Sequence, residues 1–246
     1  SLFIAFNKEK LSKYSKSSIF NDILNQIYLL FIKNQKFDIN EKYIINEENN
    51  KLITTALNLA AYKGYPKAVK YLLSNSNINE NDKMLIANND YMKIGLSPLH
   101  VAILKDDFHI VSILLSSYKV NVNLKLNKIE NQNQNQNQKQ WLRINFSHSK
   151  HNYIEYKLFC GITPLQLAII NNDFNSFYIL LENITISVNI KLDLLKTFDN
   201  ELIVGITALH LAIIHNNIYF IESLLKIPRI DVNIKDDKGK TPIELT

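Results

Sequence analysis

Two histidines in this sequence have side chains and positions that could serve chemistry. His100 and His210 each stand three residues after a Ser or Thr that opens an apolar segment. An imidazole can act as a general base or a metal ligand, but it can also hold a buried hydrogen bond. Asn58 and Gln166 take the corresponding places in two similar segments. Because an amide can replace an imidazole in a hydrogen bond but not in proton transfer, we expect structural hydrogen bonds between neighbouring units.

A second group of residues, His148, His151 and Cys160, has types that could bind zinc. Their spacing matches no common zinc pattern, and two of them adjoin a low-complexity stretch, so we expect a chance cluster. Cys160 is the only cysteine, which excludes an internal disulfide and suits a reducing, intracellular compartment. No glycine-rich phosphate loop or nucleophile motif is present. We therefore expect a non-enzymatic protein without cofactor or metal, located in the cytoplasm.

The elements that position these residues come from an internal repeat. Four segments align without gaps, and each begins with Thr or Ser. Apolar residues recur three and four places apart in each half of a segment, which predicts two short helices packed back to back. Pro98, Pro164 and Pro242 follow the opening residue, as is usual at a helix start. The four segments are TALNLAAYKGYPKAVKYLL from Thr55, SPLHVAILKDDFHIVSILL from Ser97, TPLQLAIINNDFNSFYILL from Thr163 and TALHLAIIHNNIYFIESLL from Thr207.

Each segment continues into a short tail that ends in Asn. We read these tails as Ile78-Asn79, Val122-Asn123, Val188-Asn189 and Val232-Asn233. Four of the five glycines stand two residues before an opening Thr or Ser, and Gly64 stands at a turn between helices. A backbone with positive φ would explain all five glycines.

The opening residues resemble a known family. Ser97–Ala102 (SPLHVA), Thr163–Ala168 (TPLQLA) and Thr207–Ala212 (TALHLA) are similar to the ankyrin T-P-L-H-x-A signature. The resemblance runs from about Lys51 to the end of the sequence. It implies an all-α fold, a curved solenoid of stacked helix pairs with β-hairpin loops along one edge.

The steps between opening residues are irregular, at 42 (97−55), 66 (163−97), 44 (207−163) and 34 (241−207). We place the extra residues in the hairpins, because a projecting loop tolerates added length. Apolar runs around Asn/Asp turns predict elongated hairpins over residues 83–94 and 191–204, and Val122–Ile129 and Tyr153–Phe159 are candidates to pair as strands. The array then spans residues 1–246, with repeats at 51–94, 95–160, 161–204 and 205–238 and a truncated repeat at 239–246. Residues 1–50 are predicted to be a degenerate capping repeat with a helix over Ile23–Lys33, and 130–140 a low-complexity loop.

The resemblance also suggests where a partner would bind. In ankyrin repeats the concave groove is lined by residues seven and eight places after the opening residue and by the residue before it. In this sequence these positions are Tyr62, Lys63, Leu96, Leu104, Lys105, Ile162, Ile170, Asn171, Ile206, Ile214 and His215. The row seven places on is apolar, so it either contacts a partner or is buried by hairpins that fold back over it.

These features predict a monomeric protein–protein interaction module. The alternative is the targeting or substrate-recruiting arm of a larger enzyme, such as a kinase, a ubiquitin ligase or a palmitoyl transferase. A nucleic-acid binder is suggested only by the pI near 9.0, because the net charge of +5 is scattered along the chain. No apolar run reaches the length of a membrane span, so we expect no membrane insertion.

Overall fold

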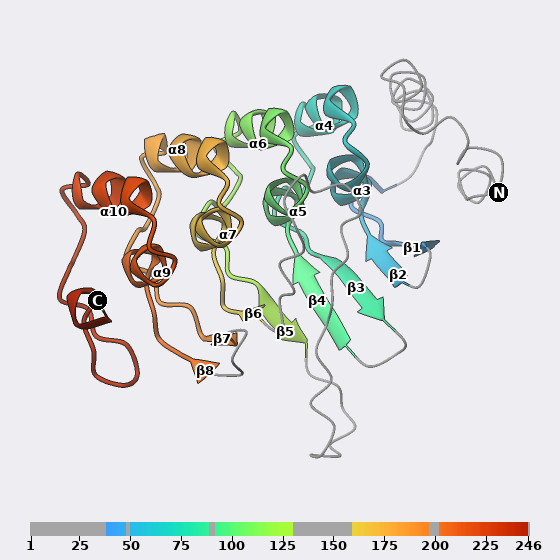
Figure 1. The fold of residues 1–246 in the computed structure, drawn as a ribbon. Helices are drawn as coiled ribbons and strands as arrows, with labels where there is room; N and C mark the ends of the chain where they lie inside the picture. Colours follow the sequence, from blue (N-terminus) through green and yellow to red (C-terminus); the bar gives the residue numbers. More distant parts are fainter. Residues whose placement is uncertain (1–37, 48–49, 89–91, 130–158, 197–201, 246) are drawn as a thin grey trace, which may run out of the picture.

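A computed structural model describes residues 38–47, 50–88, 92–129, 159–196 and 202–245 of the chain. Within these residues, helix pairs stack side by side in two layers (Figure 1). The inner layer comprises α3 (Ala56–Lys63), α5 (Pro98–Leu104), α7 (Pro164–Ile170) and α9 (Ala208–Ile214). The outer layer comprises α4 (Pro66–Leu73), α6 (Phe108–Leu115), α8 (Phe174–Glu182) and α10 (Ile218–Leu225). A short 3-10 helix, η1 (Pro242–Leu245), follows and packs on α9.

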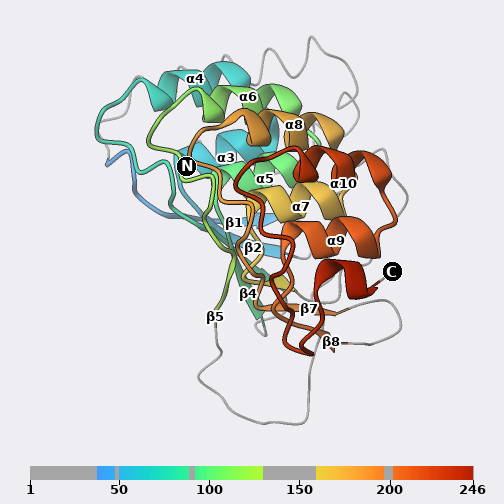
Figure 2. The same ribbon diagram turned by 90° about the vertical axis from the view of Figure 1, so that its left-hand side faces the viewer.

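Two predictions fall outside the described residues, namely the helix over Ile23–Lys33 and the low-complexity loop at 130–140. The predicted hairpin loops project from one edge of the stack, below the inner helices (Figures 1 and 2). The helix pairs predicted from the periodicity, and the solenoid that the resemblance implies, are therefore confirmed.

The helices begin where the sequence places capping residues. The hydroxyls of Ser97 and Thr163 accept hydrogen bonds from the backbone N–H three residues on, with Pro at the first helical position. Asp107 and Asp173 cap the outer helices α6 and α8 in the same way. Each cap satisfies an N–H group that a helix end otherwise leaves without a partner.

The two helices of each pair are joined by a tight turn in the left-handed backbone region. Gly64 adopts φ 72° at this turn, and Asp106, Asn172 and Asn216 adopt φ 54°, 55° and 49° at the equivalent places. Asp and Asn tolerate this conformation better than other residues with a side chain. The outer helix can therefore fold back at once onto the inner helix.

The core lies between the layers and between neighbouring repeats. The four leucines two places after each opening residue are at most 2% exposed, and the four alanines five places after it are fully buried. The small alanines let adjacent inner helices approach, and α3 contacts α5, α5 contacts α7 and α7 contacts α9. Burial of each repeat thus depends on its neighbours, as in other solenoids. The leucines are Leu57, Leu99, Leu165 and Leu209, and the alanines are Ala60, Ala102, Ala168 and Ala212.

The long hairpins build two antiparallel sheets. The first has five strands in chain order: β1 (Tyr43–Glu47), β2 (Asn50–Thr54), β3 (Met84–Asn88), β4 (Met92–Leu96) and β5 (Asn127–Ile129). The second comprises β6 (Phe159–Cys160), β7 (Leu194–Lys196) and β8 (Leu202–Ile203). Strands of successive hairpins therefore pair with one another, at β2–β3, β4–β5 and β6–β7.

The hairpins predicted over residues 83–94 and 191–204 are confirmed by the pairs β3–β4 and β7–β8. The suggested pairing of Val122–Ile129 with Tyr153–Phe159 falls mostly outside the described residues, but Leu126 exchanges backbone hydrogen bonds with Gly161 and Ile162 (2.8 and 2.9 Å) at the base of this hairpin. β5 pairs with β4 of the preceding repeat, and β6 pairs with β7 of the following repeat. The physical reason is that neighbouring hairpins offer free strand edges at the repeat spacing.

One glycine prediction is wrong. Gly64, Gly161, Gly205 and Gly239 have positive φ, but Gly95 does not. Gly95 lies within β4 opposite Leu85, because the strand continues through it. A Cβ at this position would lie 3.0 Å from the side chain of Lys83, so close approach explains the glycine better than turn geometry does.

Asparagine side chains connect the tails of successive repeats. In each case the amide donates to a carbonyl of the next tail and accepts from an N–H two residues further on. Asn123, for example, donates to Thr185 O (2.7 Å) and accepts from Ser187 N (2.8 Å). We call this set the asparagine ladder, and its members are Asn40, Asn81, Asn123 and Asn189.

The asparagine ladder shows that the tail predicted for the first segment was aligned wrongly. Asn81, not Asn79, is equivalent to Asn123 and Asn189, because each stands 26 residues after its opening residue (81−55, 123−97, 189−163). Asn79 instead supplies the N–H that Asn40 accepts, at 2.7 Å. Glu80 therefore occupies the place that Val122 and Val188 fill in the next two repeats.

Candidate functional site

The histidines of the opening segments are structural. His100 is fully buried, with Nδ1 2.7 Å from the Ser97 hydroxyl and Nε2 3.3 Å from the carbonyl oxygen of Ile162 in the next repeat. Because a carbonyl only accepts, Nε2 carries the proton and Nδ1 accepts from Ser97. Burial lowers the pKa of His100 to about 3, which keeps the ring neutral.

The equivalent side chains make the same connection. His210 Nδ1 accepts from Thr207 N (3.2 Å), and its Nε2 lies 3.3 Å from Lys240 O. Gln166 Oε1 accepts from Thr163 N (2.9 Å), and its Nε2 donates to Ile206 O of the next repeat (3.4 Å) and to Ile190 O of its own tail (2.7 Å). Imidazole and amide are thus interchangeable here, and the expectation of a structural hydrogen bond holds for these side chains.

The residues before each opening Thr or Ser do not lie at the surface. Leu96, Ile162 and Ile206 are fully buried, and Ile170 is 3% exposed. These side chains face neighbouring repeats, where the close spacing of the inner helices removes them from solvent. Four of the residues that the family pattern places in the groove therefore belong to the core.

The remaining members keep contact with solvent along the inner helices. Lys63, Ile214 and His215 are exposed, whereas Tyr62, Leu104, Lys105 and Asn171 are half-buried. We call these seven side chains the inner-helix row. They come from the C-terminal ends of α3, α5, α7 and α9 and from the turn that follows each, so the repeat spacing places them in line.

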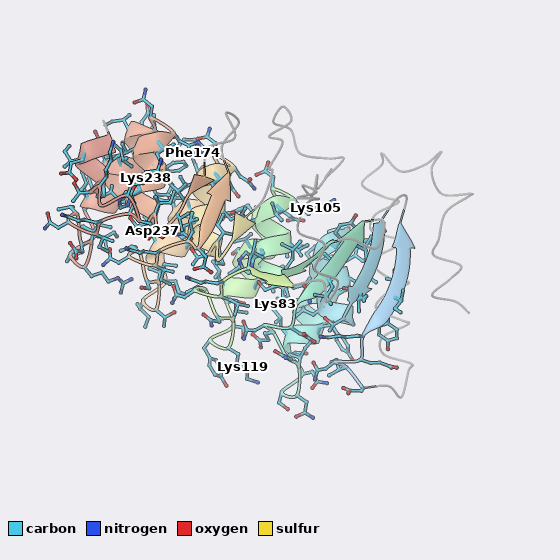
Figure 3. All side chains as sticks on the ribbon, turned by 90° about the horizontal axis from the view of Figure 1, so that it is seen from below. Lys83, Lys105, Lys119, Phe174, Asp237 and Lys238 are labelled. Carbon is cyan, nitrogen blue, oxygen red and sulfur yellow. The ribbon has the colours of Figure 1, made fainter. Side chains whose placement is uncertain are left out.

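One end of the row is basic and aromatic. The Nζ atoms of Lys63 and Lys105 lie 5.6 Å and 4.9 Å from the centre of the Tyr62 ring. A cation at this distance from a tyrosine is attracted by the negative face of the ring. Further along, Asn171 Nδ2 donates to Ile103 O at 3.4 Å, which links two neighbouring repeats. In Figure 3, Lys105 and Phe174 lie toward one edge of the stack and Lys119 toward the opposite edge.

The described part of the chain shows neither a cluster of metal-binding side chains nor a membrane-spanning helix. No group of three or more His, Cys, Asp or Glu side chains there could hold a metal ion. His148 and His151 lie outside the described residues. Among the same residues, no helix is long and apolar enough to cross a membrane.

Sequence reasoning missed two features that the fold brings together. The asparagine ladder could have been found by aligning the tails from the opening residue instead of from the nearest Asn. The aromatic side chains of α8 and α10 come together only because the two outer helices are neighbours in the stack. No local pattern separates such exposed aromatics from core residues.

Stacked helix pairs with short left-handed turns, interlocking histidines and projecting hairpins define a helical repeat solenoid. A family model described as ankyrin repeats (3 copies) matches residues 24–126 and residues 130–236. The chain therefore belongs to the ankyrin repeat family. No curated protein matches it. Ankyrin repeats are generally protein–protein interaction modules and are typically non-catalytic.

Proposed function

We propose that this chain is a non-catalytic module that binds a protein partner through its concave groove and its hairpin tips. The observation that carries the proposal is the inner-helix row. It places basic, aromatic and aliphatic side chains in line on rigid helices, with a fully buried row beside it. Such a surface is already ordered before binding, so little conformational entropy is lost when a partner docks.

The inner-helix row offers a partner two kinds of contact, apolar and charged. Ile214 is 39% exposed and Leu104 is half-buried, so both offer apolar area to a partner. Lys63 and Lys105 add positive charge beside Tyr62, where an acidic group could approach. Apolar contacts supply affinity, and the charges mainly supply orientation and speed of association.

Cross-linking tests this proposal on the complete chain. Bait protein is incubated with cell extract, treated with an amine-reactive cross-linker and analysed by mass spectrometry. Lys63 and Lys105 lie in the inner-helix row, whereas Lys67 and Lys70 lie on the outer helix α4. We expect the captured protein to be linked to Lys63 and Lys105. Links to Lys67 and Lys70 alone would contradict a binding site on the inner helices.

A paired variant adds a second measurement. Replacing Leu104 and Ile214 by Ser should weaken capture of the same protein about tenfold or more, because apolar contact area is lost. The control is Ile184→Ser, which changes an apolar side chain that is 88% exposed in a tail. Melting temperatures of all three proteins should agree within a few degrees. Unchanged capture by the Leu104/Ile214 variant would remove the inner-helix row from the binding site.

A further inference from the structure

A second surface stands out on the outer layer of the stack. Half of the exposed large hydrophobic side chains among the described residues lie on outer helices: Tyr71, Phe108, Tyr178, Ile218, Tyr219 and Leu225. Tyr178, Ile218 and Tyr219 are 44%, 56% and 64% exposed and come from the adjacent helices α8 and α10. We call these three residues the outer patch.

Packed aromatic rings hold the outer patch in place. Phe174 lies 6.1 Å from Tyr219 in an edge-on arrangement and 4.6 Å from Phe220 (centroid distances). Phe220 in turn lies 4.5 Å from Phe177, and Phe177 lies 5.4 Å from Tyr178. Phe177 and Phe220 are fully buried, so the exposed tyrosines stand on a fixed base. Figure 2 shows α8 and α10 side by side in the outer layer.

A hydroxyl contact restricts the side chain of Tyr178 further. Ser223 Oγ donates to the backbone carbonyl of Tyr219 at 2.7 Å and lies 3.3 Å from the Tyr178 hydroxyl. Rigid, half-exposed tyrosines are typical of the residues that contribute most to protein interfaces. They lose little rotamer freedom on binding and provide both apolar area and a polar tip.

The exposure of the patch is a property of its position in the repeat. Phe108 in α6 and Phe174 in α8 are the equivalents of Ile218. Phe108 is 43% exposed although a helix pair follows it, whereas Phe174 is half-buried against Tyr219 and Phe220 of α10. Tyr178 likewise lies on α8, with α10 packed beside it. A neighbouring helix pair therefore leaves Tyr178 exposed, but it can cover the position of Ile218 in part.

The helices that carry the patch have acidic but no basic side chains, and Arg229 lies just beyond the end of α8, where it donates to Ile184 O at 3.0 Å. The stretches 171–182 and 215–225, which contain α8, α10 and the turns before them, carry Asp173, Glu182 and Glu222 but no Lys or Arg. The first cation is Lys226, just after α10. The chain as a whole has a net charge of +5, and the outer helix α4 carries Lys67 and Lys70. The outer patch is thus a locally acidic, aromatic region on a basic protein.

From the packed rings and this local charge, we propose that the outer patch binds a segment of a partner protein that combines aliphatic side chains with Lys or Arg. The aliphatic groups pack on Tyr178, Ile218 and Tyr219. The cations approach Glu182 and Glu222, both of which are exposed, and the open faces of the tyrosines. This site uses the outer helices α8 and α10, whereas the inner-helix row uses the inner helices and the turns that follow them.

Selection from a random peptide library displayed on phage tests the proposal on the complete chain. We expect enriched peptides to carry aliphatic residues together with Lys or Arg. The variant Ile218→Ser/Tyr219→Ser should bind them about tenfold more weakly or worse, because apolar contacts are lost. The matched control is Tyr118→Ser, which replaces a tyrosine that is 92% exposed in a tail. Its affinity should equal that of the original chain.

A charge-reversal variant keeps the test decisive if the apolar variant folds poorly. Glu182→Lys/Glu222→Lys changes only exposed side chains, so its melting temperature should hardly change. It should lose the basic peptides and select acidic ones instead. Enrichment without basic residues, equal binding by both variants, or no enriched peptide at all would overturn the proposal. Failure of the inner-helix row to capture a partner protein would leave these outcomes unchanged, so the two proposals can fail separately.

Discussion

Glu80 is a charged residue in an apolar place. It is 3% exposed, and its Oε2 has no hydrogen-bond partner among the described residues. Val122 and Val188 fill the equivalent site in the next two repeats, at 1% and 2% exposure. We predict that Glu80→Val raises the free energy of unfolding by about 1–3 kcal/mol, since a buried unsatisfied polar group is removed. Urea denaturation measures the change, and a lower stability would show that the carboxylate has a stabilising partner.

His100 should make stability depend on pH. Its pKa is about 3 in the folded chain and 6.5 in an unperturbed state, so only the unfolded chain takes up this proton between these values. The contribution of neutral His100 to the free energy of unfolding is therefore fully present above pH 6.5, and it is lost progressively as the pH decreases toward 3. The loss per histidine is about 1.4 kcal/mol for each pH unit. Burial also lowers the pKa of His210, which acts in the same direction.

The matched control comes from the chain itself. Gln166 accepts from the opening hydroxyl of Thr163 and donates to Ile206 O without a titrating group, so His100→Gln should fold. Its free energy of unfolding should fall less steeply between pH 6.5 and pH 3 than that of the original chain. Equal slopes in chemical denaturation at several pH values would rule out His100 as a source of the pH dependence.

Among the structural elements, the tails depend on the asparagine ladder. Asn123→Ala removes hydrogen bonds of 2.7 Å and 2.8 Å to the following tail. We predict a loss of about 1–2 kcal/mol in the free energy of unfolding, because two backbone groups lose their partner. Asn233 is exposed, and within the described residues its side chain makes no hydrogen bond to another repeat. Asn233→Ala should therefore change stability by less than about 0.5 kcal/mol, and an equal loss in both variants would contradict the role of the ladder.

At the scale of the whole stack, the repeat that carries a core substitution should determine which helices are destabilised. Leu99 and Leu209 are 1% and 2% exposed, and replacing either by Ala should cost about 2–5 kcal/mol. Leu99 lies in α5, which contacts the inner helices on both sides, whereas Leu209 lies in α9 near the C-terminal end. In a solenoid the defect spreads to nearest neighbours. Hydrogen exchange by mass spectrometry should show loss of protection around α9 and α10 for Leu209→Ala, with α3 and α4 unchanged.

For Leu99→Ala we expect faster exchange in helices on both sides of α5. A uniform loss of protection across all described helices in both variants would mean that the stack unfolds as a single unit. Either result also bears on binding, because a partner that spans several repeats needs them all in register.

Local patterns in the sequence were sufficient for the helix pairs, their caps and two of the hairpins. Apolar residues three and four apart, Ser or Thr before Pro, and apolar runs around Asn/Asp turns act over a few residues, so no tertiary contact is needed to interpret them. The interlocking role of His100 also followed from the sequence, because Gln166 and Asn58 stand in the same place.

Only the tertiary structure decided which residues are buried and which neighbours they meet. Leu96, Ile162 and Ile206 look like groove residues by position but face the core, and Asn81 rather than Asn79 belongs to the ladder. The outer patch needs α8 and α10 to pack side by side, although Phe174 and Tyr219 are 45 residues apart (219−174). Helix formation is decided by near neighbours along the chain, whereas exposure depends on the repeats that pack against each helix.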